Sequence, residues 1–136
     1  MTRPLVLVVD DQRNIAQAAQ LLLEHAGMEV LVATSPAEAA TIWESRKSDI
    51  HVLMTDFDLK GAIHGEQLAS KFEADKPSLR SLIVTAYELD DHQFPGRTEG
   101  VDFLQKPWDP TALISAVQGL LNNQGRVPIP SAALAC

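Results

Sequence analysis

The sequence predicts an α/β domain built on a five-stranded parallel sheet with helices on both faces. Short apolar runs rich in β-branched residues alternate along the chain with longer segments whose apolar residues recur at helical spacing. Strands that alternate with helices build parallel sheets, and runs that are apolar throughout are typical of strands covered on both faces. The 136 residues are enough for one such domain with a single core.

The first half of the chain contains three predicted strands, at residues 5–9, 29–34 and 51–55. The segment between the first two is predicted to be a helix that ends at Gly27, because glycine readily adopts the conformation that stops a helix. The apolar residues that we expect to face inward from this helix are Ile15, Ala19, Leu22 and Ala26.

A strong start signal opens the helix before the third strand. Ser35 can act as N-cap, Pro36 occupies the first helical position, and Glu38 can complete a capping box. Ile42 and Trp43 are its expected apolar contacts.

The second half contains strands predicted at 81–85 and 100–104. A helix over 65–75 should turn Leu68 and Phe72 inward and end before Pro77. The closing helix has Asp109 as cap and Pro110 at its first position. Its expected inward residues are Leu113, Val117 and Leu121.

Residues 86–99 fit this alternation less well. Pro95 and Gly96 limit any helix there to Leu89–Phe94, so we predict that the fourth helix is short or irregular.

Residues 1–122 are predicted to form the folded domain. Residues 123–136 are predicted to be a flexible C-terminal tail, because they carry too little apolar bulk to fold alone.

Composition excludes several classes of function. The net charge of −7 leaves no basic stripe for nucleic acid. A single cysteine, Cys136, cannot form a disulfide framework. No apolar segment has the length of a membrane span or a signal peptide. We therefore expect a cytoplasmic protein with no membrane or nucleic-acid partner.

The expected arrangement is flavodoxin-like and doubly wound, with strand order 2-1-3-4-5. Such sheets bind ligands outside the carboxyl ends of their strands. Polar residues stand at four of these ends, and we expect them to converge in one cleft: Asp10 and Asp11, Asp56, Thr85, and Lys106.

These residue types together suit phosphoryl chemistry. Clustered carboxylates repel one another unless a cation intervenes, and Mg²⁺ prefers oxygen ligands. An aspartate can act as nucleophile toward phosphorus, while Lys106 and Thr85 can contact phosphoryl oxygens. Each residue alone has an ordinary explanation as a turn, a cap or a solvated charge, but their joint occurrence at successive strand ends favours function.

At these positions the sequence resembles the receiver domain of two-component response regulators. The matching segments are "VLVVDD" (6–11), "VLMTDFDL" (52–59), "LIVTA" (82–86) and "GVDFLQKP" (100–107). The resemblance covers roughly residues 4–122 and rests on a specific order of acid pair, central aspartate, threonine and Lys-Pro.

The resemblance implies a role for each acid. Asp56 would be the phosphoacceptor and would also offer one oxygen to Mg²⁺. Asp11 would bind the metal directly, and Asp10 would act through water. The backbone carbonyl of Asp58 would be the third protein ligand.

It also implies roles on the last two strands. The Thr85 hydroxyl would move toward the phosphoryl group, and Lys106 would form a salt bridge to it. The Lys106–Pro107 peptide bond would be cis, as X–Pro bonds alone readily are. Phe103 stands where receivers often carry an aromatic switch residue, although plain core packing is an equal alternative.

The sequence departs from the usual receiver pattern in three places. Leu59-Lys60 replaces a common Pro-containing pair, and the loop to Gly65 is about one residue longer. Asp58 and Tyr87 flank the site and are expected to tune hydrolysis. Pro95-Gly96 interrupts a region that many receivers use to contact their outputs, so dimerisation through that face is in doubt. Longer loops like the one that leads to Gly65 also occur in receivers attached to, or related to, hybrid histidine kinases.

The predicted function is that of a phosphoacceptor domain that takes a phosphoryl group from a histidine kinase or a histidine phosphotransfer protein. It would not be an enzyme beyond accelerating its own phosphorylation and dephosphorylation. We expect a monomer or weak homodimer, either stand-alone or part of a hybrid kinase, acting on an unknown downstream protein target. Two alternatives are a phosphate-independent interaction module of the same fold, and a haloacid-dehalogenase-like phosphatase in which the Asp58 side chain would be a general acid–base.

Overall fold

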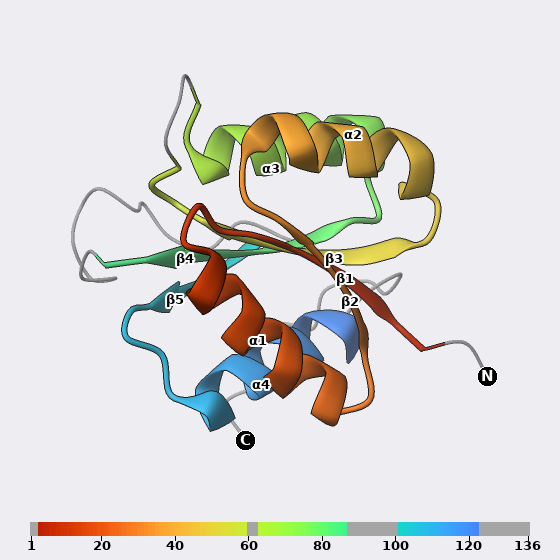
Figure 1. Cartoon of the computed structure of the whole chain (residues 1–136). Helices are drawn as coiled ribbons and strands as arrows, with labels where there is room; N and C mark the ends of the chain where they lie inside the picture. The colour runs from red at the N-terminus through yellow and green to blue at the C-terminus, as the bar shows by residue number, and fades with distance from the viewer. Residues whose placement is uncertain (1–2, 60–62, 87–100, 123–136) are drawn as a thin grey trace, which may run out of the picture.

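The computed structural model describes residues 3–59, 63–86 and 101–122. Within these ranges five strands form one parallel sheet in the order β2-β1-β3-β4-β5 (Figure 1). The predicted fold class and strand order are confirmed. The strands are β1 (Leu5–Val9), β2 (Glu29–Ala33), β3 (Ile50–Asp56), β4 (Arg80–Thr85) and β5 (Val101–Gln105).

Two described helices cover each face of the sheet. Figure 1 shows α2 (Pro36–Arg46) and α3 (Gly65–Asp75) above it, and α1 (Arg13–His25) and α4 (Pro110–Asn122) below it. The inner strand β1, between β2 and β3, is buried along its whole length, as predicted from its uninterrupted apolar run.

Alternate residues of β1 face the two helical layers. Leu5, Leu7 and Val9 pack in the α2/α3 core, which also includes Trp43 and Phe72 from those helices. Val6 and Val8 pack in the α1/α4 core with residues of α1 and α4. This period of two follows from the pleat of a strand, so each face of the sheet has its own core.

Helix α1 ends as predicted, but its buried face is shifted by about one residue. Gly27 has a φ of 99°, and the N–H groups of Gly27 and Met28 donate to the carbonyls of Glu24 and Leu23. The buried residues of the helix are Ala16, Ala19 and Leu23. Of the predicted set, Ala19 is confirmed, and Leu22 and Ala26 are partly buried against the same core. Small alanine side chains let the helix lie close to the sheet, which leaves Ile15 at the margin, only partly buried.

Helix α2 begins with the expected cap, yet the predicted capping box is wrong in one detail. The Ser35 hydroxyl accepts a bond from the Glu38 N–H at 3.1 Å. The Glu38 carboxylate does not return to Ser35. It accepts from both the N–H and the hydroxyl of Thr34, at 2.6 and 3.2 Å, because Thr34 offers two donors to one oxygen.

Helices α2 and α3 are joined through two aromatic rings. Trp43 stacks on Phe72 with ring centroids 4.4 Å apart, and its indole N–H donates to the Asp75 carboxylate at 2.8 Å. Lys47 pairs with the same carboxylate at 3.2 Å. The buried indole therefore has a partner for its polar edge.

Two expectations fall outside the described residues: the short fourth helix within 86–99, of which only Ala86 is described, and the tail at 123–136.

Helix α4 has the predicted cap, since the Asp109 carboxylate accepts from the Ala112 N–H at 3.2 Å. Leu113 and Val117 are buried as expected, whereas Leu120 is buried more deeply than Leu121. No helix in the described ranges is long and apolar enough to cross a membrane.

The backbone that connects α2 to β3 is contacted by Lys76, the residue that follows the last turn of α3. The Lys76 ammonium donates to the backbone carbonyls of Lys47 and Ile50 at 2.9 and 2.5 Å. We expect Lys76→Met to lower the free energy of unfolding by about 1–2 kcal/mol, because those carbonyls lose a charged donor. The exposed Lys71 on α3 is the matched control, and Lys71→Met should change stability by less than about 0.5 kcal/mol. Urea denaturation measures both, and equal effects would contradict this role of Lys76.

Candidate functional site

Acidic and basic side chains meet at the carboxyl edge of the sheet. Asp10 and Asp11 directly follow β1, Asp56 is the last residue of β3, and Lys106 directly follows β5. Carboxylate oxygens of Asp10, Asp11 and Asp56 all lie within 4.8 Å of one another. The predicted convergence of these strand ends is therefore present in the structure.

Backbone hydrogen bonds fix the direction of each strand end. The Asp10 N–H donates to the Ala33 carbonyl at 3.1 Å, which continues the β1–β2 ladder. The Gln12 N–H then donates to the Asp10 carboxylate at 2.9 Å and turns the chain into α1. On the other side, the Lys106 N–H donates to the Thr85 carbonyl at 2.7 Å, so Lys106 is tied to the end of β4.

The Lys106 ammonium lies between two of the carboxylates. Its Nζ is 3.2 Å from Asp56 Oδ2 and 3.5 Å from Asp10 Oδ2. Asp10 and Asp56 are buried, and only 20% of the Lys106 side chain is exposed. One cation thus serves two acids in a place where water screens charge only weakly.

The lysine does not fully offset the cost of burying these acids. Burial raises the pKa of Asp56, the charge of Asp10 raises it further, and Lys106 acts in the opposite direction. Burial likewise raises the pKa of Asp10, with a further rise from Asp11, against the lowering effects of the Gln12 N–H and Lys106. Both carboxyl groups therefore hold protons more readily than an ordinary aspartate.

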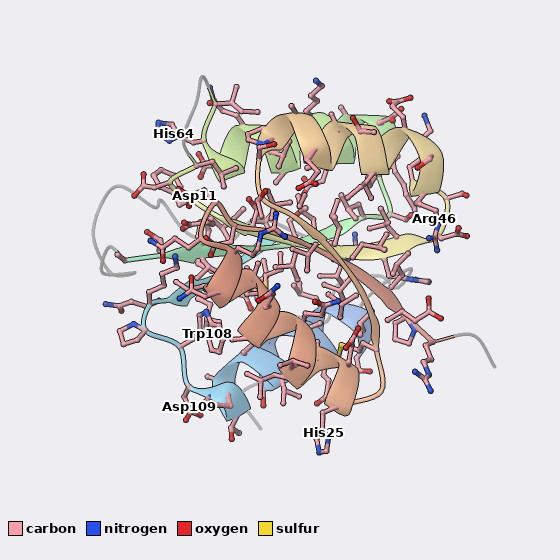
Figure 2. The ribbon with its side chains drawn as sticks, viewed as in Figure 1. Asp11, His25, Arg46, His64, Trp108 and Asp109 are labelled. Atoms are coloured by element: carbon pink, nitrogen blue, oxygen red, sulfur yellow. The ribbon has the colours of Figure 1, made fainter. Side chains whose placement is uncertain are left out.

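The acids open into a hollow of about 470 Å³. Its charged lining consists of Asp11, Asp56, Asp58 and Lys106. The rest of its wall comes from Gln12, Ile15, Leu59 and Ala86. The Asp58 side chain is more than half exposed and lies 4.0 Å from His64 Nδ1. In Figure 2, Asp11 and His64 lie on the same side of the molecule, beyond the strand ends. The role predicted for the Asp58 carbonyl stays a prediction.

The donor set fits a hard divalent cation. Three carboxylates lie close enough to share one ion, and the hollow leaves room for water and phosphate oxygens. This is the ligand chemistry that Mg²⁺ prefers. A cation here would stabilise the charged carboxylates, and so would oppose the burial and the repulsion that together raise the two pKa values.

The two predicted switch residues lie on β4 and β5, the strands that lead to this edge of the sheet. Thr85 is buried at the end of β4. Phe103 is partly buried and packs against the α2/α3 core. Its packing agrees with the core alternative, and the switch roles of both residues stay predictions.

Sequence reasoning missed how closely Gly65 approaches the site. A Cβ at Gly65 would overlap the Asp56 carbonyl oxygen and lie 2.9 Å from Thr55 Oγ1. The Gly65 N–H also donates to the Phe57 carbonyl at 2.9 Å. The only signal in the sequence was a glycine opening a helix, and that signal does not reveal which backbone it touches.

A second, apolar pocket of about 440 Å³ adjoins the acidic hollow. It is lined by Ile15, Ala86, Lys106, Pro107 and Trp108, of which Ile15, Ala86 and Lys106 also line the hollow. Figure 2 shows Trp108 between α1 and the chain that leads into α4. The Lys106–Pro107 peptide bond in its wall is cis, as the resemblance implies.

Comparison with known proteins agrees with this geometry. Residues 6–118 match the family model described as response regulator receiver domain. The phosphate regulon transcriptional regulatory protein PhoB of Pseudomonas aeruginosa is 28% identical over 88% of this chain and 52% of its own length. The chain thus spans about half the length of the curated relatives it matches.

Solved structures show the same fold. A receiver domain protein of Clostridium thermocellum has a TM-score of 0.79 and 28% identity, covering 88% of this chain and 95% of its own. The response regulator TrrA of Thermotoga maritima, solved in complex with Mg²⁺-BeF, has a TM-score of 0.73 and 23% identity over 86% and 98% of the two chains. The matched family model, the strand order and the acid-lined edge of the sheet agree, and the chain belongs to the response regulator receiver domain family.

Proposed function

We propose that this receiver domain accepts a phosphoryl group from phosphohistidine onto Asp56, with Mg²⁺ as cofactor, and changes conformation in response. The observation that carries the proposal is the placement of Asp56. Its carboxylate contacts Lys106, has two further carboxylates nearby, and faces an open hollow.

The chemistry requires one nucleophile and a way to neutralise charge. An Asp56 carboxylate oxygen forms the new O–P bond while the P–N bond to the donor imidazole breaks, and its electron pair returns to that nitrogen. Lys106 is within reach of phosphoryl oxygens on Asp56. Mg²⁺, held by Asp11 and Asp56 with help from Asp10 and Asp58, would neutralise the remaining charge.

Thr85 and Phe103 would transmit the change. A phosphoryl group on Asp56 adds charge beside the end of β4, and the Thr85 hydroxyl offers it a donor. The domain would act as a two-state switch rather than as an enzyme with its own substrate. Cytoplasmic location and a protein target downstream are part of the same proposal.

A protein phosphodonor suits the surface around the site. The apolar pocket shares Ile15, Ala86 and Lys106 with the acidic hollow, so a donor that reaches Asp56 would also cover the pocket. Burial of apolar side chains there would contribute affinity that a small phosphodonor cannot use. This supports a histidine kinase or histidine phosphotransfer protein as partner.

The phosphorylation site can be tested in a phosphate-affinity gel after incubation with acetyl phosphate and Mg²⁺. The wild type should give a shifted band and Asp56→Asn none, because the amide is not a nucleophile. Asp58→Asn keeps the backbone carbonyl and should still become phosphorylated. Loss of all phosphorylation in Asp58→Asn would favour the phosphatase alternative, and an unshifted wild type would favour the phosphate-independent module.

Mg²⁺ affinity should begin to fall at a higher pH than it would for ordinary aspartates. The metal binds the deprotonated carboxylates, and burial has raised the pKa values of Asp10 and Asp56. Affinity should therefore be constant above those raised values. It should weaken about tenfold per pH unit, for each proton displaced, once the pH falls below them. Isothermal titration calorimetry across pH measures this. A decline that starts only near the ordinary aspartate value would contradict the raised pKa values.

The apolar pocket should matter for a protein donor only. We expect Ile15→Ala to lower kcat/KM for transfer from a phosphohistidine protein about fivefold, because an apolar contact at the interface is lost. Phosphorylation by acetyl phosphate should change by less than about twofold, because Ile15 forms part of the wall of the acidic hollow but supplies no nucleophile or ligand there. Leu21, 68% exposed on the same helix, does not line the pocket, so Leu21→Ala is the matched control. Equal losses with both donors would show that Ile15 acts on the site itself.

A further inference from the structure

The backbone just after Asp56 lies where strand β3 is no longer paired with β1 but is still paired with β4. The pairing of β1 with β3 ends at Val9 and Thr55. The pairing of β3 with β4 continues one residue further, to Asp56 and Val84. Asp56 is therefore paired on one side only, and another contact must hold the β1 side of its backbone.

A threonine hydroxyl supplies such a contact. Thr55 is fully buried, and its Oγ1 donates to the Asp56 carbonyl oxygen at 3.1 Å. The N–H of the same peptide unit, that of Phe57, donates to the Val84 carbonyl at 2.7 Å. The peptide unit that follows Asp56 is thus held at its oxygen by Thr55 and at its nitrogen by β4.

The first residue of α3 makes room for this bond. A Cβ at Gly65 would overlap the Asp56 carbonyl oxygen and press on Thr55 Oγ1, so a larger residue would displace both. The Gly65 N–H holds the next carbonyl, that of Phe57. Two consecutive carbonyls beyond the β1 ladder are therefore fixed by neighbouring side-chain and backbone donors.

We propose that Thr55 and Gly65 are positioning residues that hold the Asp56 main chain so that its carboxylate stays aligned with Lys106 and the acid pair. The proposal rests on the proposed function and names residues that serve it without touching the phosphoryl group. In-line attack tolerates little displacement of the nucleophile, because a shift of about 1 Å can slow a reaction about a hundredfold. The hydrogen bond from the Thr55 hydroxyl to the Asp56 carbonyl oxygen is next to the nucleophile, and its loss should therefore slow phosphorylation.

Substitutions at Thr55 separate the hydroxyl from the shape of the side chain. Thr55→Val keeps the shape and removes the donor, whereas Thr55→Ser keeps the donor and removes a methyl group. The matched control is Thr41→Val on α2, because the exposed Thr41 hydroxyl also donates to a backbone carbonyl, that of Ala37, away from the site. The measurement is the phosphorylation rate with acetyl phosphate at saturating Mg²⁺. The assay temperature is one at which circular dichroism shows every variant folded.

We expect Thr55→Val to be about tenfold slower than wild type, and Thr55→Ser and Thr41→Val to stay within about twofold of it. A wild-type rate in Thr55→Val, or equal slowing in Thr55→Val and Thr55→Ser, would overturn the role of the hydroxyl. If Thr55→Val does not fold, Thr55→Ala against Thr55→Ser makes the same comparison, and equal rates overturn the proposal. Failure of the wild type to become phosphorylated would instead refute the proposed function.

Discussion

The burial of neighbouring, mutually repelling carboxylates is the constraint around which the functional edge of this sheet is built. Asp10 and Asp56 are both buried at neighbouring strand ends, with Asp11 beside them. Lys106 bridges two of them, yet their pKa values remain raised. An arrangement that costs stability in this way is typical of a functional site. It leaves a region of excess negative charge that a divalent cation would relieve and in which phosphate oxygens could be bound.

The fold brings these acids together through its central strands and keeps them in place from both helical layers. Strand β1 is covered on both faces and pairs with β3, so the residues after Val9 and at Asp56 share one edge. Helix α1 begins directly after the acid pair, where the Gln12 N–H holds Asp10. Gly65, the first residue of helix α3, lies directly against the Asp56 carbonyl. Lys106 follows β5, the strand at the edge of the sheet. The site therefore combines residues that are far apart in the sequence.

The sequence predicted the strands, their order and the charged residues of the site, because apolar runs and strand-end polarity are local patterns. For α1 it predicted the buried Ala19 but missed Ala16 and Leu23, since small residues there let the helix approach the sheet and shift its deepest contacts. Nor could it reveal Gly65 against Asp56 or the pocket beside Ile15 and Trp108. Those features are contacts between different helices, strands and loops. The pattern of apolar residues within one helix or strand does not show which residues of another element it will contact.

The central claim is that three carboxylates and one lysine form a single site for a metal and a phosphoryl group. The Mg²⁺ site tests it most directly, through a crystal structure determined with the ion at a pH above the raised pKa values of Asp10 and Asp56. The account predicts one ion bound to Asp11, Asp56 and the Asp58 carbonyl, with Lys106 still close to Asp56. An ion bound elsewhere, or Asp56 turned away from Asp11 and Lys106 when the ion is present, would contradict it.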